Sequence, residues 1–114
     1  MTFLTNMTLN EYQERAVKTA IYGAGNGTIY PALGLAGEAG EVANVAKKVL
    51  RDDGGLISAE KKAQLIKEAG DCLWYLAALA RDLETDLETL AVINLEKLES
   101  RMKRGVIGGS GDNR

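Results

Sequence analysis

Two pairs of acidic residues, each set among small residues, are the side chains of this sequence best placed to do chemistry. Glu38 and Glu41 lie three residues apart, and each directly follows a glycine. Glu68 and Asp71 repeat the spacing. Residues three apart share one face of a helix. Each pair therefore predicts two carboxylates that point the same way.

The glycines beside the first pair need a physical reason if this stretch is helical. Glycine inside a helix costs roughly 1 kcal/mol relative to alanine, and Gly34, Gly37 and Gly40 all fall within a few residues of Glu38. A missing side chain allows another helix or a ligand to approach the backbone closely. We expect such an approach along this stretch.

Either acidic pair alone is most simply a solvated helix face, because exposed charges are the norm. The two pairs together favour a shared site. If their helices pack antiparallel, four carboxylates converge, and like charges that close require a cation. Carboxylate oxygens without histidine favour a hard ion, Mg²⁺ or Mn²⁺. A metal-activated water and a spare carboxylate as base then indicate metal-assisted phosphate chemistry.

Composition excludes several other classes of function. The 114 residues suffice for one domain with one core. A net charge of −2 gives no reason to expect nucleic acid or a membrane surface as a partner. The sequence has no histidine, which removes His-based catalysis and most zinc sites.

Nothing in the sequence predicts export or membrane insertion. Residues 1–7 lack the basic and apolar regions of a signal peptide, and the longest apolar run, residues 72–80, is too short to span a bilayer. Cys72 is the only cysteine, so no internal disulfide can form. We expect a cytoplasmic protein.

The periodicity of apolar residues predicts an all-α fold, a helical bundle of about four main helices. Capping residues Thr8, Ser58 and Thr85 mark three of the starts, and Pro31 suits the first turn of the remaining helix. The expected helices cover about residues 9–22, 31–50, 59–83 and 86–104.

The expected domain organisation is a single helical domain over residues 1–104, followed by a Gly-rich tail over residues 105–114. The third helix is apolar nearly all round, which predicts burial on several sides. The fourth is expected to turn residues such as Ile93 and Met102 inward. Oligomerisation, as a homodimer or larger, would complete the bundle.

Candidate substrate contacts lie on the third and fourth expected helices. Lys97, Arg101 and Arg104 recur at helical spacing close to Asn94 and could bind phosphate. Tyr75 follows Asp71 by one turn and could stack on a base, although an aromatic there also suits a plain core. For the cations the alternative is helix solubility and pairing with nearby acids, namely Glu88, Glu96 and Glu99.

These residues resemble the MazG-type nucleoside triphosphate pyrophosphohydrolases. The motif of that family, Glu-x-x-Glu, a gap, then Glu-x-x-Asp, is matched by Glu38, Glu41, Glu68 and Asp71, and the resemblance covers roughly residues 9–104. It implies an all-α fold and Mg²⁺-dependent cleavage of (d)NTP to (d)NMP and pyrophosphate. It also implies that the four acids bind the metal, for which Mn²⁺ may substitute.

The resemblance also implies roles for individual residues and an assembly. Glu38 or Glu41 would activate the attacking water, and Tyr75, Asn94 and Lys97 resemble positions that contact the substrate. Arg101 and Arg104 would help to stabilise the pyrophosphate leaving group. Relatives assemble as dimers or tetramers, so we expect a homodimer or homotetramer that binds a nucleoside triphosphate.

Two other classes of function remain as alternatives. One is a catalytically inactive helical interaction module that kept the fold, against which the retention of all four acids argues. The other is a carboxylate-bridged redox metal protein, which would use Glu-x-x-His pairs that this sequence lacks.

Overall fold

A computed structural model describes residues 6–23 and 26–114 of the chain. This described part is helical without any strand, so the expected all-α class with four main helices is confirmed. Expectations for the first five residues, and for part of the Gly-rich loop after the first helix, lie outside the described residues. The elements are α1 Leu9–Ala16, the 3₁₀ turn η1 Val17–Thr19, α2 Ile29–Asp52, α3 Ala59–Asp82 and α4 Leu87–Lys103.

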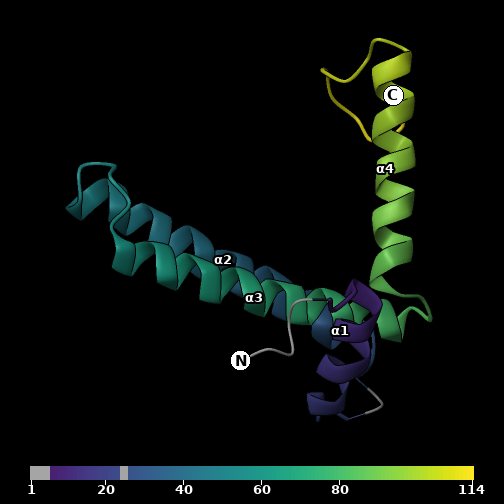
Figure 1. Cartoon of the computed structure of the whole chain (residues 1–114), viewed down its shortest axis with the longest axis horizontal. Helices are drawn as coiled ribbons and strands as arrows, with labels where there is room; N and C mark the ends of the chain where they lie inside the picture. Colours follow the sequence, from purple (N-terminus) through teal and green to yellow (C-terminus); the bar gives the residue numbers. More distant parts are fainter. Residues whose placement is uncertain (1–5, 24–25) are drawn as a thin grey trace.

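Helices α2 and α3 form a long antiparallel hairpin (Figure 1). Pro31 lies buried in the first turn of α2, where its missing N–H costs nothing. At the far end, Gly54 and Gly55 adopt the left-handed φ values of 61° and 82° that turn the chain. The Ser58 hydroxyl then accepts from the Lys61 N–H at 3.1 Å, so the predicted cap of α3 is confirmed.

The first helix is shorter than expected. Thr8 caps α1 as predicted by accepting from the Glu11 N–H, but α1 ends at Ala16 and continues only as η1 instead of running to residue 22. Thr19 explains the change, because its hydroxyl donates to the Ala16 carbonyl at 2.7 Å and accepts from Trp74 Nε1 at 2.8 Å. A contact with α3 thus fixes where α1 ends.

The core is small and lies where α1 meets the end of α3 and the start of α4. Its buried members are small or aliphatic side chains, with partly buried aromatic and leucine residues packed around them. Gln13 links α1 to the α3–α4 connection and to the start of α4, since its Nε2 donates to the Thr85 carbonyl and its Oε1 accepts from the Leu87 N–H. The buried members are Ala16, Ala77, Ala80 and Leu87.

The N-cap of α4 differs from the prediction by one residue. Asp86, not Thr85, caps the helix by accepting from the Thr89 N–H at 2.8 Å. The Thr85 N–H instead takes part in closing the end of α3, since it donates to the Ala80 carbonyl at 2.8 Å, and α4 begins after the next residue. Glu84 has a left-handed φ of 60°, and this geometry closes the end of α3 as a Schellman motif.

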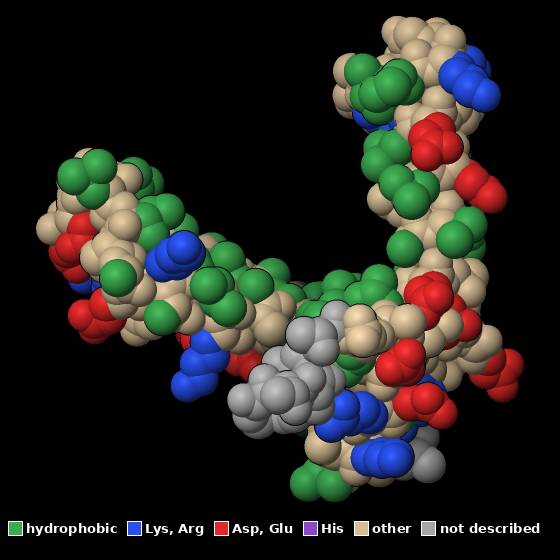
Figure 2. All heavy atoms as spheres, in the orientation of Figure 1, with side chains coloured by type: hydrophobic (Ala, Val, Ile, Leu, Met, Phe, Trp, Pro, Cys, Tyr) green, Lys and Arg blue, Asp and Glu red, His purple; other side chains and the backbone are tan. Residues whose placement is uncertain are grey.

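Helix α4 projects away from the α2/α3 hairpin (Figure 1). The radius of gyration is 17.0 Å, against roughly 13 Å for a compact domain of this length. Ile93 and Met102 are 61% and 70% exposed. In a single chain they do not point inward, and that expectation is wrong. Figure 2 shows hydrophobic side chains at the surface along the hairpin and on α4.

The exposed apolar surface is not a membrane-spanning segment. Over the residues that the structure describes, no helix combines the length and the apolar character needed to cross a bilayer.

Gly34 allows α3 to approach α2 closely. A Cβ atom at Gly34 would lie 2.1 Å from Tyr75 Cε1 and 2.4 Å from Tyr75 Cζ, far inside van der Waals contact. The expected close approach is therefore confirmed at this position. At Gly37 and Gly40 a Cβ would meet no described atom within 4 Å, so no helix of the same chain approaches there.

Substituting Gly34 tests this contact. Gly34→Ala should lower the free energy of unfolding by about 1–3 kcal/mol, because the added methyl group displaces the Tyr75 ring. The matched control, Gly37→Ala, should raise stability by up to about 1 kcal/mol, because only helix propensity changes there. Urea unfolding of both variants measures the difference, and an equal gain in stability for both would contradict the contact.

Candidate metal centre

The antiparallel packing of α2 and α3 brings together acids that lie far apart in the sequence. One carboxylate oxygen each from Glu38, Glu68 and Asp71 lies within 4.8 Å of the others. Glu38 and Glu68 are half-buried, whereas Asp71 is exposed. We refer to these three residues as the acidic cluster.

Glu41 lies outside the acidic cluster, although sequence analysis grouped all four acids. It follows Glu38 by three residues on α2 and its side chain is exposed. Its negative charge nevertheless contributes to raising the pKa of Glu38, which places it within electrostatic reach. The structure therefore separates three converging acids from one adjacent acid.

Two helical faces position the acidic cluster. On α2, Tyr30 and Glu38 lie one turn on either side of Gly34, and such i, i+4 residues share a face. On α3, Asp71 precedes Tyr75 by four residues. Because Tyr75 packs directly on Gly34, the acids one turn away on each helix are brought face to face.

The electrostatics of the acidic cluster favour a bound cation. Partial burial raises the pKa of Glu38, and the negative charges of Asp71, Glu68 and Glu41 raise it further. Within residues 6–23 and 26–114, no ion pair joins the three acids to a lysine or arginine. The donor set is carboxylate oxygen alone, which fits Mg²⁺ or Mn²⁺ and does not fit a soft metal.

An aromatic group borders the acidic cluster. The Tyr75 ring lies edge-on to Trp74, with centroids 4.9 Å apart, and 6.5 Å from the Tyr30 ring. Tyr30 in turn stacks on Tyr22 at 4.5 Å. Burial is the main cause that raises the pKa of Tyr75, and Tyr30 and the negative charge of Glu38 raise it further. Tyr75, a candidate substrate contact from the sequence, therefore lies next to the acids.

Sequence reasoning missed Tyr22 and Tyr30. Tyr22 is held by tertiary contacts, since its hydroxyl donates to Asp82 Oδ2 at 2.6 Å and accepts from Arg81 Nη2 at 2.9 Å. No local sequence pattern predicts these contacts. Tyr30 carried a usable signal, because it precedes Gly34 by four residues and so shares its helical face with Glu38.

The structure does not bring the α4 candidates to the acidic cluster within one chain. Asn94, Lys97 and Arg101 lie on α4, which projects away from the hairpin (Figure 1), and Arg104 is the residue that caps its C-terminal end. Lys97 and Arg101 form ion pairs with Asp112 of the tail, which sequence analysis did not foresee as a partner.

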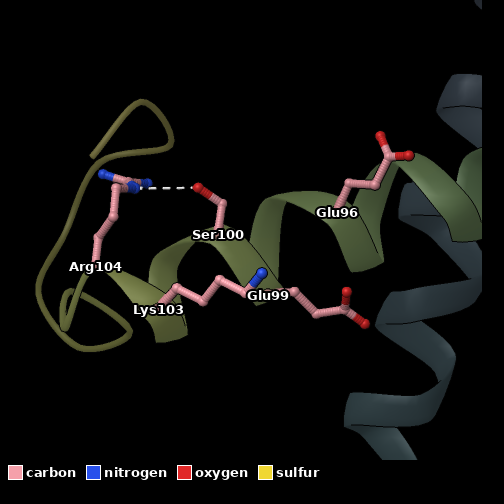
Figure 3. A pocket seen from close by; sticks show the side chains of 5 residues that line it. All are labelled: Glu96, Glu99, Ser100, Lys103 and Arg104. Carbon is pink, nitrogen blue, oxygen red and sulfur yellow. Dashed lines mark hydrogen bonds between the residues drawn. The ribbon is translucent and has the colours of Figure 1, made fainter.

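A cavity of about 330 Å³ lies beside α4 (Figure 3). In it the Arg104 guanidinium turns towards Ser100 and donates to the Ser100 hydroxyl at 3.0 Å. Glu96 and Glu99 balance the charges of Lys103 and Arg104. Since these four formal charges cancel, the lining of this cavity has no excess of either charge, whereas the acidic cluster does.

Comparisons with known proteins agree with this geometry. The family model described as the MazG nucleotide pyrophosphohydrolase domain matches residues 30–106, which include the acidic cluster and α4. The chain is also 51% identical over 114 residues to "Gene 37 protein" of Mycobacterium phage L5, covering 95% of this chain and 100% of that protein. No solved structure gives a significant match. Because this match spans residues 30–106, more than half of the chain, it shows that the chain belongs to the MazG nucleotide pyrophosphohydrolase family.

Proposed function

We propose that the protein is a Mg²⁺-dependent hydrolase that cleaves (d)NTP to (d)NMP and pyrophosphate. The observation that carries the proposal is the convergence of Glu38, Glu68 and Asp71 within 4.8 Å, in a chain of the MazG family. Carboxylates alone repel a triphosphate, so the acidic cluster would need a bound cation to accept such a substrate.

We assign two roles to the acids, metal binding and proton transfer. Glu38, Glu68 and Asp71 would hold Mg²⁺ or Mn²⁺ through their carboxylate oxygen atoms. The bound ion supplies Lewis acidity towards a phosphoryl oxygen and a more acidic water. Glu41 is exposed beside the three ligands and is the acid best placed to accept the proton of the attacking water, with Glu38 as the other candidate.

The aromatic group next to the acidic cluster suits a nucleobase. Tyr75 lies beside Glu38, and Tyr30, with 44% of its surface exposed, offers part of its ring to solvent. Stacking on such rings tolerates several bases. We assign Tyr75 and Tyr30 to the base and the acidic cluster to the phosphates.

The proposal includes a homodimer or homotetramer. The chain exposes 8162 Å², roughly 2,000 Å² more than a compact monomer of its mass would expose. Ile93 and Met102 contribute to an apolar surface on α4 that the described residues leave exposed. A second copy that covers α4 could also carry Asn94 and Lys97 to the acidic cluster of its neighbour.

Metal binding is tested by thermal unfolding with Mg²⁺ and with EDTA. Mg²⁺ should raise the Tm of the wild type, whereas Asp71→Asn should lose both this shift and turnover because a ligand is gone. In EDTA, Asp71→Asn should match or exceed the wild type, because one source of repulsion is removed. Glu14→Gln, an exposed acid on α1, removes the same charge elsewhere and serves as the control.

The pH dependence follows from the raised pKa of Glu38. A proton bound more tightly in the folded state stabilises the metal-free protein fully below the ordinary pKa of 4.5. That contribution is lost as the pH rises through the raised folded-state pKa. In EDTA, the gain in Tm of Asp71→Asn over the wild type should therefore be larger at pH 8 than at pH 4.

Two results would refute the metal site. One is an unchanged Tm when Mg²⁺ is added to the wild type, and the other is full activity in EDTA.

The bond that breaks is tested by hydrolysis in ¹⁸O-labelled water. Attack at the α-phosphorus should place the label in the monophosphate and release unlabelled pyrophosphate. Label in pyrophosphate would mean attack at the β-phosphorus, and orthophosphate as first product would mean γ cleavage. Both outcomes would overturn the pyrophosphohydrolase assignment, and no turnover of any triphosphate would favour the inactive interaction module.

Assembly is tested by sedimentation at micromolar concentration. The wild type should sediment as a dimer or tetramer, and Met102→Glu should shift it towards monomer by placing a charge on the apolar surface of α4. Leu56→Glu, at the distant hairpin turn and 78% exposed, is the matched control and should leave the assembly unchanged. A monomeric wild type would contradict the oligomer, and an intact oligomer in Met102→Glu would exclude α4 as its interface.

A further inference from the structure

The tail over residues 105–114 is an ordered loop that folds back beside α4 (Figure 1). Its last residue holds it closed, because the Arg114 guanidinium donates to the carbonyls of Val106, Gly108 and Ile107 at 2.9–3.1 Å and also to that of Gly111. Three glycines with left-handed φ values between 73° and 91° allow the reversals that this closure needs. These are Gly105, Gly109 and Gly111.

The closed tail places oxygen atoms on three cations of α4. Asp112 Oδ1 lies 2.7 Å from Lys97 Nζ and 3.0 Å from Arg101 Nη2, which also donates to the Asp112 carbonyl. Arg104 Nη2 donates to the Arg114 carbonyl oxygen at 2.7 Å. We call Lys97, Arg101 and Arg104 the α4 cation cluster. Every member of it is bound to the tail.

The tail accepts only some of the hydrogen bonds that the α4 cation cluster can donate. Arg101 is 5% exposed, yet its Nε finds no acceptor in the described part of the chain. A buried unpaired donor costs about 1–3 kcal/mol. The Asp112 side chain that pairs with it is 76% exposed and also pairs with Lys97. An anion with more oxygen atoms than one carboxylate would fit the cluster better.

The family resemblance already implies that these cations contact the phosphates of the substrate. We propose that the Asp112 carboxylate, which pairs with Lys97 and Arg101, is a tethered competitor for polyphosphate at the α4 cation cluster. The tether holds the carboxylate at an effective concentration in the millimolar range, which a phosphate ligand must overcome. Hydrogen bonds from Lys97 and Arg101 lower the pKa of Asp112, so the competitor stays charged at neutral pH. The biological relevance rests on the proposed function, which releases pyrophosphate, but the binding requires no turnover.

Titration of inorganic pyrophosphate into the full chain in EDTA tests the proposal by calorimetry. Asp112→Asn should lower the Kd about three- to tenfold, because it removes one charge-assisted contact at an exposed site. Arg114→Ala should act in the same direction by opening the tail while leaving the Asp112 carboxylate in place. Glu14→Gln removes the same charge from α1 and should leave the Kd unchanged.

Two results would overturn the proposal. One is a Kd that is the same in the wild type and in both tail variants. The other is undiminished pyrophosphate binding after Lys97→Met and Arg104→Met are combined, since binding would then lie elsewhere.

Failure of the proposed function would look different. A wild type that hydrolyses no triphosphate, while Asp112→Asn still binds pyrophosphate more tightly, would refute the enzyme and retain the tail as a competitor. Turnover with no effect of Asp112→Asn on pyrophosphate binding would refute the competitor alone.

Discussion

The contact between α2 and α3 at Gly34 and Tyr75 is the constraint on which the candidate site depends. Only the absence of a side chain at Gly34 lets the Tyr75 ring lie against α2, and this spacing sets Glu38 opposite Asp71 one turn away. The packing holds together three carboxylates that repel one another, so the hairpin must offset that repulsion until a cation does so. Close aromatic packing and the convergence of three carboxylates are therefore two results of one helix–helix contact.

The same chain leaves much of its apolar surface uncovered. Its core consists largely of alanine, and Ala77 and Ala80 let helices approach closely but bury little area each. Burial of apolar surface is the main stabilising term of a fold. The oligomer that we propose would bury the exposed apolar surface of α4 and would thereby add to the stability of a chain with so small a core.

The cations of α4 link the tail to the phosphate chemistry that we propose. Arg101 is buried by its surroundings and paired with a single exposed carboxylate, an arrangement that leaves donor capacity unused. A site that is filled by its own chain can exchange that occupant for a ligand of the same charge. The short Gly-rich tail would then set the affinity of the protein for polyphosphate without contacting the acidic cluster.

The features that the sequence determined by itself are those set by residues close together in the chain. The acid spacing, the caps at Thr8 and Ser58, and the long helices follow from periodicity and from side chains that bond their own backbone, which act within a few residues. Tertiary structure decided the rest. The Schellman closure at Glu84 moved the α4 cap to Asp86, the direction of α4 separated Lys97 from the acids, and the tail supplied Asp112 as its partner. These outcomes depend on contacts between residues distant in sequence, whose geometry no local pattern encodes.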